Sequence, residues 1–158
     1  MDMTDLNALR QVAEELRRQG PYWRTFRPVE HLMGWLYDEG KCVYCDVNLV
    51  PAHTKARSAT TDHLLPKGQY PELHTDPLNA VPACADCNHT KGTWDPNENG
   101  ERPQCLTSEM RRDFIARAKE HIRAKRQRGE ATSQQDLAAW QEALEALATL
   151  RSGSKLVR

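Results

Sequence analysis

The chain has 158 residues, with 22 basic and 22 acidic side chains, and 39% of its residues are hydrophobic. This length fits one domain, or one small core with helical additions, because single domains usually have about 100–200 residues. The balanced charge and the hydrophobic content exclude a polybasic tail and a charge-rich disordered chain. No stretch approaches the roughly 20 apolar residues of a membrane span, and the first residues lack the pattern of a signal peptide. We therefore expect a cytoplasmic protein that makes no membrane contact.

Two helices are expected before residue 41. Apolar residues at helical spacing predict the first over residues 5–19, ending at Gly20-Pro21. The second runs from about Pro28 to Glu39 and ends at Gly40. Residues 41–105 are instead interrupted by prolines at 51, 66, 71, 77, 82, 96 and 103. This middle segment should therefore form short strands and loops that depend on something other than a large core.

The segment after Cys105 predicts two more helices. The first carries an apolar residue at every fourth position: Met110, Phe114, Ala118 and Ile122. Arg128-Gly129-Glu130 is predicted to end it. The second carries apolar residues in steps of three, four and three: Leu137, Trp140, Leu144 and Leu147. We expect this face to pack within the chain, with a homodimer seam as the alternative.

Positive charge gathers on the first of these two helices. Residues 107–130 contain eight basic and four acidic side chains, although the whole chain is neutral. A local basic surface of this kind can neutralise phosphates, and a solvated helix face is an equally good interpretation. The candidate DNA contacts are Arg111, Arg112, Lys119 and Arg123.

Four of the five cysteines form two C-x-x-C pairs, namely Cys42 with Cys45 and Cys84 with Cys87. Four thiolates in this pattern favour a tetrahedral structural zinc site with no open coordination position. A redox function for either pair is the less favoured alternative. Because 38 residues separate the pairs, zinc would join the two ends of an inserted unit.

The inserted unit contains an Asp62-His63 pair at the end of a β-prone run, just before Pro66. A carboxylate next to an imidazole offers a hard ligand for Mg²⁺ and a base of near-neutral pKa. Asn79 follows, and Asn88 comes directly after the last cysteine of the second pair. Each of these residues alone is common in structural roles, but the ordered set is far more specific.

The order of these motifs from Cys42 to Gly92 resembles the HNH endonucleases, in the four-cysteine, zinc-stabilised form of the ββα-metal fold. The resemblance covers about a third of the chain and leaves the flanking helices out. It implies an α+β fold, with a small zinc-stabilised core flanked by N-terminal and C-terminal helices. The expected segments are residues 1–40 (helical), 41–106 (nuclease core) and 107–158 (helical).

The resemblance also implies a role for each motif residue. His63 would be the general base that activates water, and Asp62 would bind the catalytic Mg²⁺ or Mn²⁺. Asn79 would hold the loop and orient the base, and Asn88 would complete the metal site. His89 is the second candidate for the position given to Asn88.

Three other side chains have open interpretations. Lys91 is either a phosphate or loop contact or an ordinary surface lysine. His53 and His74 are weaker candidates for binding DNA or metal, whereas His31 and His121 are expected to be structural.

The leading interpretation is therefore a metal-dependent endonuclease that acts on double-stranded DNA. The alternative is a non-catalytic zinc module that binds nucleic acid or a partner protein. A homodimer or an activating protein partner is possible in either case, since one site makes one cut.

Overall fold

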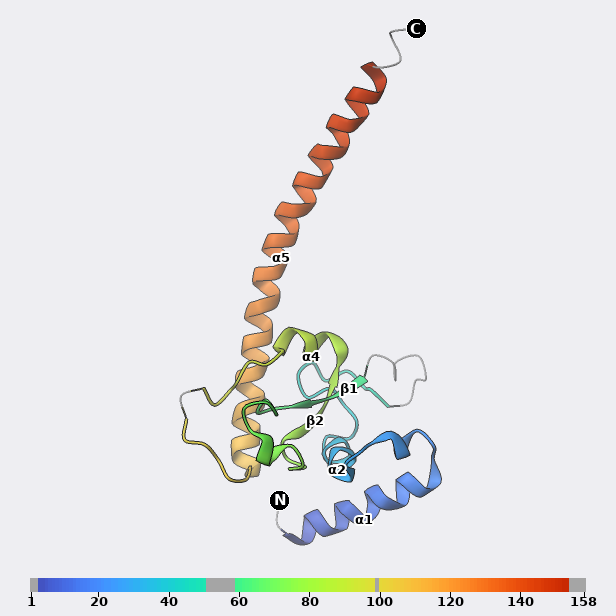
Figure 1. Ribbon diagram of the computed structural model, residues 1–158, viewed down its shortest axis with the longest axis vertical. Coiled ribbons are helices and arrows are strands. Elements are labelled where there is room, and N and C mark those ends of the chain that lie inside the picture. Colours follow the sequence, from blue (N-terminus) through green and yellow to red (C-terminus); the bar gives the residue numbers. More distant parts are fainter. Residues whose placement is uncertain (1–2, 51–58, 99, 154–158) are drawn as a thin grey trace. The chain divides into compact units, whose positions relative to one another are not determined.

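The computed structural model describes residues 3–50, 59–98 and 100–153. Figure 1 shows the helices and strands in chain order. They are α1 (Met3–Gln19), η1 (Trp23–Thr25), α2 (Val29–Tyr37), β1 (Ala59–His63), η2 (Pro71–Leu73), β2 (Ala80–Cys84), α4 (Ala85–Lys91) and α5 (Ser108–Gly153). The α+β class is confirmed. The chain divides into two compact units, Met1–Ile122 and Arg123–Arg158.

The sheet of the first unit consists of β1 and β2, which pair antiparallel. Ala59 lies opposite Cys84 at one end, and His63 lies opposite Ala80 at the other. β2 runs directly into α4, where the Cys84 sulfur caps the helix by accepting a hydrogen bond from the Cys87 N–H (3.4 Å). The second cysteine pair therefore also fixes the start of α4.

Helix α2 packs against the sheet at very short range. A Cβ placed on Gly34 would lie 2.0 Å from the carbonyl oxygen of Ala80, so only glycine allows this approach. Beside it, Trp35 is 3% exposed and donates its indole N–H to the Thr61 hydroxyl (2.9 Å). The helix predicted over residues 28–39 is thus held close to both strands.

Helix α5 covers another part of the core of the first unit. Phe114, Ala118 and Ile122 are buried, as their spacing predicts. Arg111, on the same helix, is only 1% exposed, donates to the Leu78 carbonyl (2.8 Å) and pairs with Asp38. The guanidinium therefore stabilises the interior and is inaccessible to a DNA phosphate.

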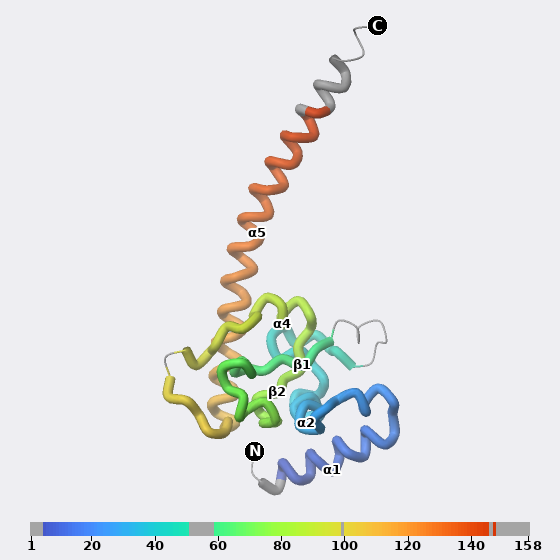
Figure 2. Tube along the Cα trace, viewed as in Figure 1, coloured from blue at the N-terminus to red at the C-terminus, as the bar shows by residue number. Residues whose placement is uncertain are grey.

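The predicted break at Arg128-Gly129-Glu130 is wrong, because α5 continues through it as one helix, as Figure 2 also shows. Glycine in a helix interior costs only about 1 kcal/mol relative to alanine. The residues around Gly129 are mostly good helix formers, so this cost is not enough to end the helix. One helix, rather than two, follows the core.

Four large apolar residues on the later part of α5, within the second unit, are exposed. The exposed fractions are 57% for Leu137, 63% for Trp140, 49% for Leu144 and 46% for Leu147. The expectation that this face packs within the chain is wrong for the described residues, because all four of these side chains are exposed. None of the described helices combines the length and the apolar content that a membrane crossing requires.

Candidate active site and metal centre

The four predicted zinc ligands lie together. The sulfur atoms of Cys42, Cys45, Cys84 and Cys87 are all within 4.8 Å of one another. The Cys45 and Cys84 sulfurs are 3.8 Å apart, which matches the spacing of about 3.8 Å expected when Zn–S bonds of about 2.3 Å are arranged tetrahedrally. The chemistry and the spacing of this donor set both fit a structural zinc ion.

A tight turn shapes the first cysteine pair. Asp46 adopts a positive φ of 60°, and its N–H bonds the Cys42 carbonyl (2.8 Å). Lys41 and Asn48 then form an antiparallel bridge that closes the turn. Burial raises the pKa of the Cys42 thiol to about 11, so this thiol keeps its proton at neutral pH unless a cation offsets the cost. A zinc ion supplies that charge.

One face of β1 meets α4. Successive strand residues point to opposite faces, so Thr60 and Asp62 share this face. The Asn88 amide donates to the Thr60 hydroxyl (2.9 Å), and the Lys91 ammonium lies 3.2 Å from the Asp62 carboxylate. The two predicted ligands of the catalytic cation, Asp62 and Asn88, therefore lie on the same side of the sheet.

The Asp62 carboxylate already has a full set of partners. It accepts hydrogen bonds from the Tyr44 hydroxyl (2.5 Å) and from the backbone N–H of His63 (2.8 Å), in addition to the ion pair with Lys91. Asp62 is 7% exposed and Lys91 is 2% exposed. The Lys91 ammonium therefore occupies the position beside Asp62 that a divalent cation would take, and a cation could bind there only if this ammonium moved away. Lys91 also donates to the His63 carbonyl (2.9 Å), so it makes a loop contact.

The His63 side chain lies on the other face of β1, with Thr61. Its Nε2 is 3.3 Å from the carbonyl oxygen of His74, and the Nε2 of His31 is 3.2 Å from the same oxygen. Burial and the proximity of His31 lower the pKa of His63 to about 4, and burial also lowers the pKa of His31. His63 is therefore a neutral imidazole at neutral pH. If Nε2 carries the proton given to the carbonyl, Nδ1 keeps a free lone pair.

Asn79 connects the segment after β1 to the segment that carries His74. Its side chain is fully buried. The Asn79 Oδ1 accepts a bond from the Leu65 N–H (2.8 Å), and the Nδ2 donates to the carbonyls of Leu65 (3.2 Å) and Leu73 (3.1 Å). One side chain thus fixes the backbone next to His74, which in turn contacts the His63 ring.

The predicted set is therefore divided between two faces. Asp62 faces α4, which carries Asn88, whereas His63 lies with His31 and His74. Sequence reasoning considered His74 only as a weak candidate and took His31 to be structural. The sequence carries no local signal for this cluster, because its members lie on α2, at the end of β1 and just after η2.

The other predicted residues have less defined surroundings. His89 is exposed, and His53 lies outside the described residues. Arg112 and Arg123 are exposed on α5, and Lys119 forms a long ion pair with Asp46 (3.5 Å). His121 stacks on Trp94, with ring centroids 4.3 Å apart.

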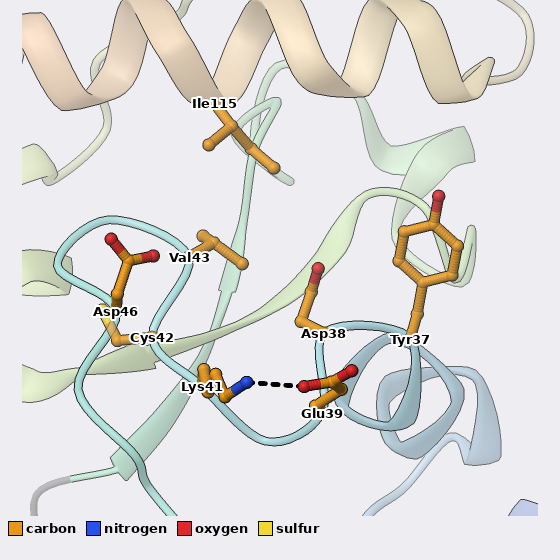
Figure 3. A pocket seen from close by; sticks show the side chains of 8 residues that line it. All are labelled: Tyr37, Asp38, Glu39, Lys41, Cys42, Val43, Asp46 and Ile115. Carbon is orange, nitrogen blue, oxygen red and sulfur yellow. Dashed lines mark hydrogen bonds and ion pairs between the residues drawn. The ribbon is translucent and has the colours of Figure 1, made fainter.

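A pocket of about 270 Å³ lies beside the first cysteine pair (Figure 3). An ion pair between Lys41 and Glu39 (2.5 Å) spans part of its wall. The lining residues are Tyr37, Asp38, Glu39, Lys41, Cys42, Val43, Asp46 and Ile115. None of the predicted catalytic residues lines this pocket, so we do not assign the reaction to it.

A known protein family matches the segment that contains the four cysteines, both strands and α4. The HNH endonuclease family matches residues 42–93, which confirms the resemblance for this segment. The chain is also similar to the Septu protein PtuB of Bacillus thuringiensis, at 40% identity over 55 residues. The similar stretch covers 35% of this chain and 20% of that protein, so only about a fifth of PtuB is represented. No solved structure matches the chain.

Proposed function

We propose that the HNH segment hydrolyses phosphodiester bonds in DNA, with His63 as the general base. The observation that carries the proposal is the His63 ring at the end of β1, whose Nε2 lies 3.3 Å from the His74 carbonyl and whose lowered pKa favours the neutral form. The His63 Nδ1 takes a proton from water, the water oxygen bonds to phosphorus, and the bond from phosphorus to the leaving oxygen breaks. The leaving oxygen then takes a proton from solvent water. A base held in position in this way contributes typically 10²–10⁴-fold to a reaction rate.

The residues around His63 act as positioning residues. The His74 carbonyl holds the imidazole in one orientation, because it accepts from only one of the two ring nitrogens. Asn79 holds the backbone next to that carbonyl through its bonds to Leu65 and Leu73. The same contacts keep the Nδ1 lone pair directed away from the carbonyl.

The predicted cation at Asp62 and Asn88 is a separate part of the proposal. A bound Mg²⁺ or Mn²⁺ would stabilise the negative charge that develops on the phosphate. It requires Lys91 to move away from the carboxylate, since the two side chains are paired in the folded chain. The proton transfer to His63 needs no cation, whereas stabilisation of the phosphate charge does, so we expect cleavage to require Mg²⁺ or Mn²⁺.

Basic residues of α5 that are at least partly exposed are the proposed DNA contacts. Arg112, Lys119 and Arg123 are candidates, since Arg111 is buried. Such contacts position the backbone and carry no sequence information. Target choice would then depend on loops, on a second copy of the chain or on a protein partner.

The test is nicking of a supercoiled plasmid by the wild type, His63→Ala and His89→Ala. Each protein is first shown to hold about one zinc ion per chain, which is the stoichiometry of a four-cysteine site. We expect nicking that requires Mg²⁺ or Mn²⁺, stops with EDTA, persists in His89→Ala and is lost in His63→Ala. If the zinc-loaded wild type binds DNA without cutting it under any of these conditions, the non-catalytic zinc module is the better interpretation.

A further inference from the structure

Three histidine rings meet on the α2 side of β1. His31, His63 and His74 each offer a ring nitrogen, and these atoms lie within 4.8 Å of one another. The ring centroids are 5.1 Å apart for His31 and His63, 5.3 Å for His31 and His74, and 5.2 Å for His63 and His74. All three side chains are partly exposed, so the cluster is accessible from solvent.

The donor atoms of this cluster differ from those of the four cysteines and from those of Asp62 and Asn88. Four thiolates suit a closed structural zinc site, and oxygen ligands suit Mg²⁺. Three imidazole ligands suit borderline ions such as Zn²⁺, Ni²⁺ or Cu²⁺, and they leave coordination positions open. Bonds of about 2.0–2.1 Å to one ion require nitrogens about 3.3 Å apart, so binding needs only a small approach of rings whose nitrogens already lie within 4.8 Å of one another.

The surroundings hold the rings in place for such an ion. The His74 carbonyl lies within hydrogen-bond distance of the His31 and His63 rings. Metal-binding histidines usually use the second ring nitrogen for this kind of contact. His31 is also fixed by its helix, because α2 contacts the backbone of β2 at Gly34.

We propose that His31, His63 and His74 form a second metal site, which binds a divalent transition-metal ion and thereby inhibits DNA cleavage. The ion takes the lone pair of His63 that would otherwise accept the proton from water. The inhibitory role rests on the proposed function, whereas the binding site does not. Mg²⁺ is not a competitor for this site, because it prefers oxygen ligands.

The test is a titration of the zinc-loaded protein with Ni²⁺, in which calorimetry measures the stoichiometry and the affinity of binding. We expect one Ni²⁺ per chain, and affinity lower by about tenfold or more in His31→Gln and His74→Gln. His89→Gln is the matched control, because this exposed histidine lies on α4 and should leave binding unchanged. Ni-edge X-ray absorption of the wild type gives the ligands without any substitution, and it should show imidazole nitrogens and no sulfur.

Plasmid nicking tests the inhibitory role separately. Saturating Ni²⁺ should slow the wild type by about tenfold or more, and it should slow His31→Gln much less, each relative to its own rate without Ni²⁺. Absence of bound Ni²⁺, thiolate ligation, or equal affinity in all variants would overturn the site. Imidazole-bound Ni²⁺ without inhibition would overturn the inhibitory role. A chain that binds Ni²⁺ through imidazoles but cuts no DNA would keep the site and reject the proposed function.

Discussion

At the scale of single residues, Asn79 should contribute strongly to stability. Its amide satisfies one buried N–H and two carbonyl groups, and each such group left without a partner costs about 1–3 kcal/mol. We therefore expect Asn79→Ala to lower the free energy of unfolding by about 3 kcal/mol. Urea denaturation measures this change. Asn48→Ala is the control, because the exposed Asn48 side chain accepts a hydrogen bond from the Val50 N–H and its loss should cost less than about 1 kcal/mol.

The buried pair of Lys91 and Asp62 makes a different prediction. Lys91→Met leaves the Asp62 charge buried without its partner, and we expect a loss of about 3–5 kcal/mol. Adding Asp62→Asn should recover much of this loss, because the unpaired charge is then removed. Denaturant midpoints of the single and double variants measure the coupling. Independent, additive losses would contradict this coupling. Lys119→Met is the control, because it removes a long surface ion pair with Asp46 and should change the free energy of unfolding little.

At the scale of elements, the contact between α2 and β2 depends on the missing side chain of Gly34. A Cβ there would also lie 2.9 Å from the Pro77 carbonyl, so Gly34→Ala must push the helix away from the sheet. We expect destabilisation of about 3 kcal/mol or more, together with weaker Ni²⁺ binding as His31 shifts. Thermal unfolding and calorimetry are the measurements.

Gly68→Ala is the matched control for this substitution. A Cβ at Gly68 meets no atom within 4 Å, so stability should change by less than about 0.5 kcal/mol. Equal effects of the two substitutions would contradict the close approach of α2.

Helices were the most predictable elements. Helical periodicity and the stop signals located α1, α2 and the apolar face of α5. The error at Gly129 arose because a single glycine is a weak stop signal between strong helix formers. The exposure of Leu137 and Trp140 was not predictable, since an apolar stripe shows that a face can be buried but not whether the chain supplies a partner.

At the scale of the whole molecule, zinc should decide whether the first unit folds. The two cysteine pairs lie at opposite ends of the segment that carries Asp62, His63 and Asn79. We expect removal of zinc by a strong chelator to lower the unfolding midpoint by about 10 °C or more, and Cys45→Ser to act in the same direction. His63→Ala should keep both the zinc and the midpoint. An unchanged midpoint after verified zinc loss would contradict a structural role.

The sequence motifs were sufficient to predict that the four cysteines lie together and that residues 42–93 match the HNH family. Two C-x-x-C pairs determine a ligand set by residue type and spacing alone. The division of Asp62 and His63 between two faces follows from strand alternation, which the β-prone run already contained. The partners on each face could not be predicted, because Lys91 and His31 reach β1 through tertiary packing over 29 and 32 residues.

The close approach at Gly34 also limits which sequences can adopt this packing. Positions such as Leu32 and Trp35 face side chains, which can exchange volume with their neighbours during evolution. Gly34 faces a carbonyl oxygen, which has no smaller alternative and cannot be substituted. In divergent chains that keep α2 on this sheet, we therefore expect variation at positions 32 and 35 but glycine at position 34. Glycine at position 34, three residues after His31, is therefore the feature to look for in chains where a histidine of α2 lies beside His63.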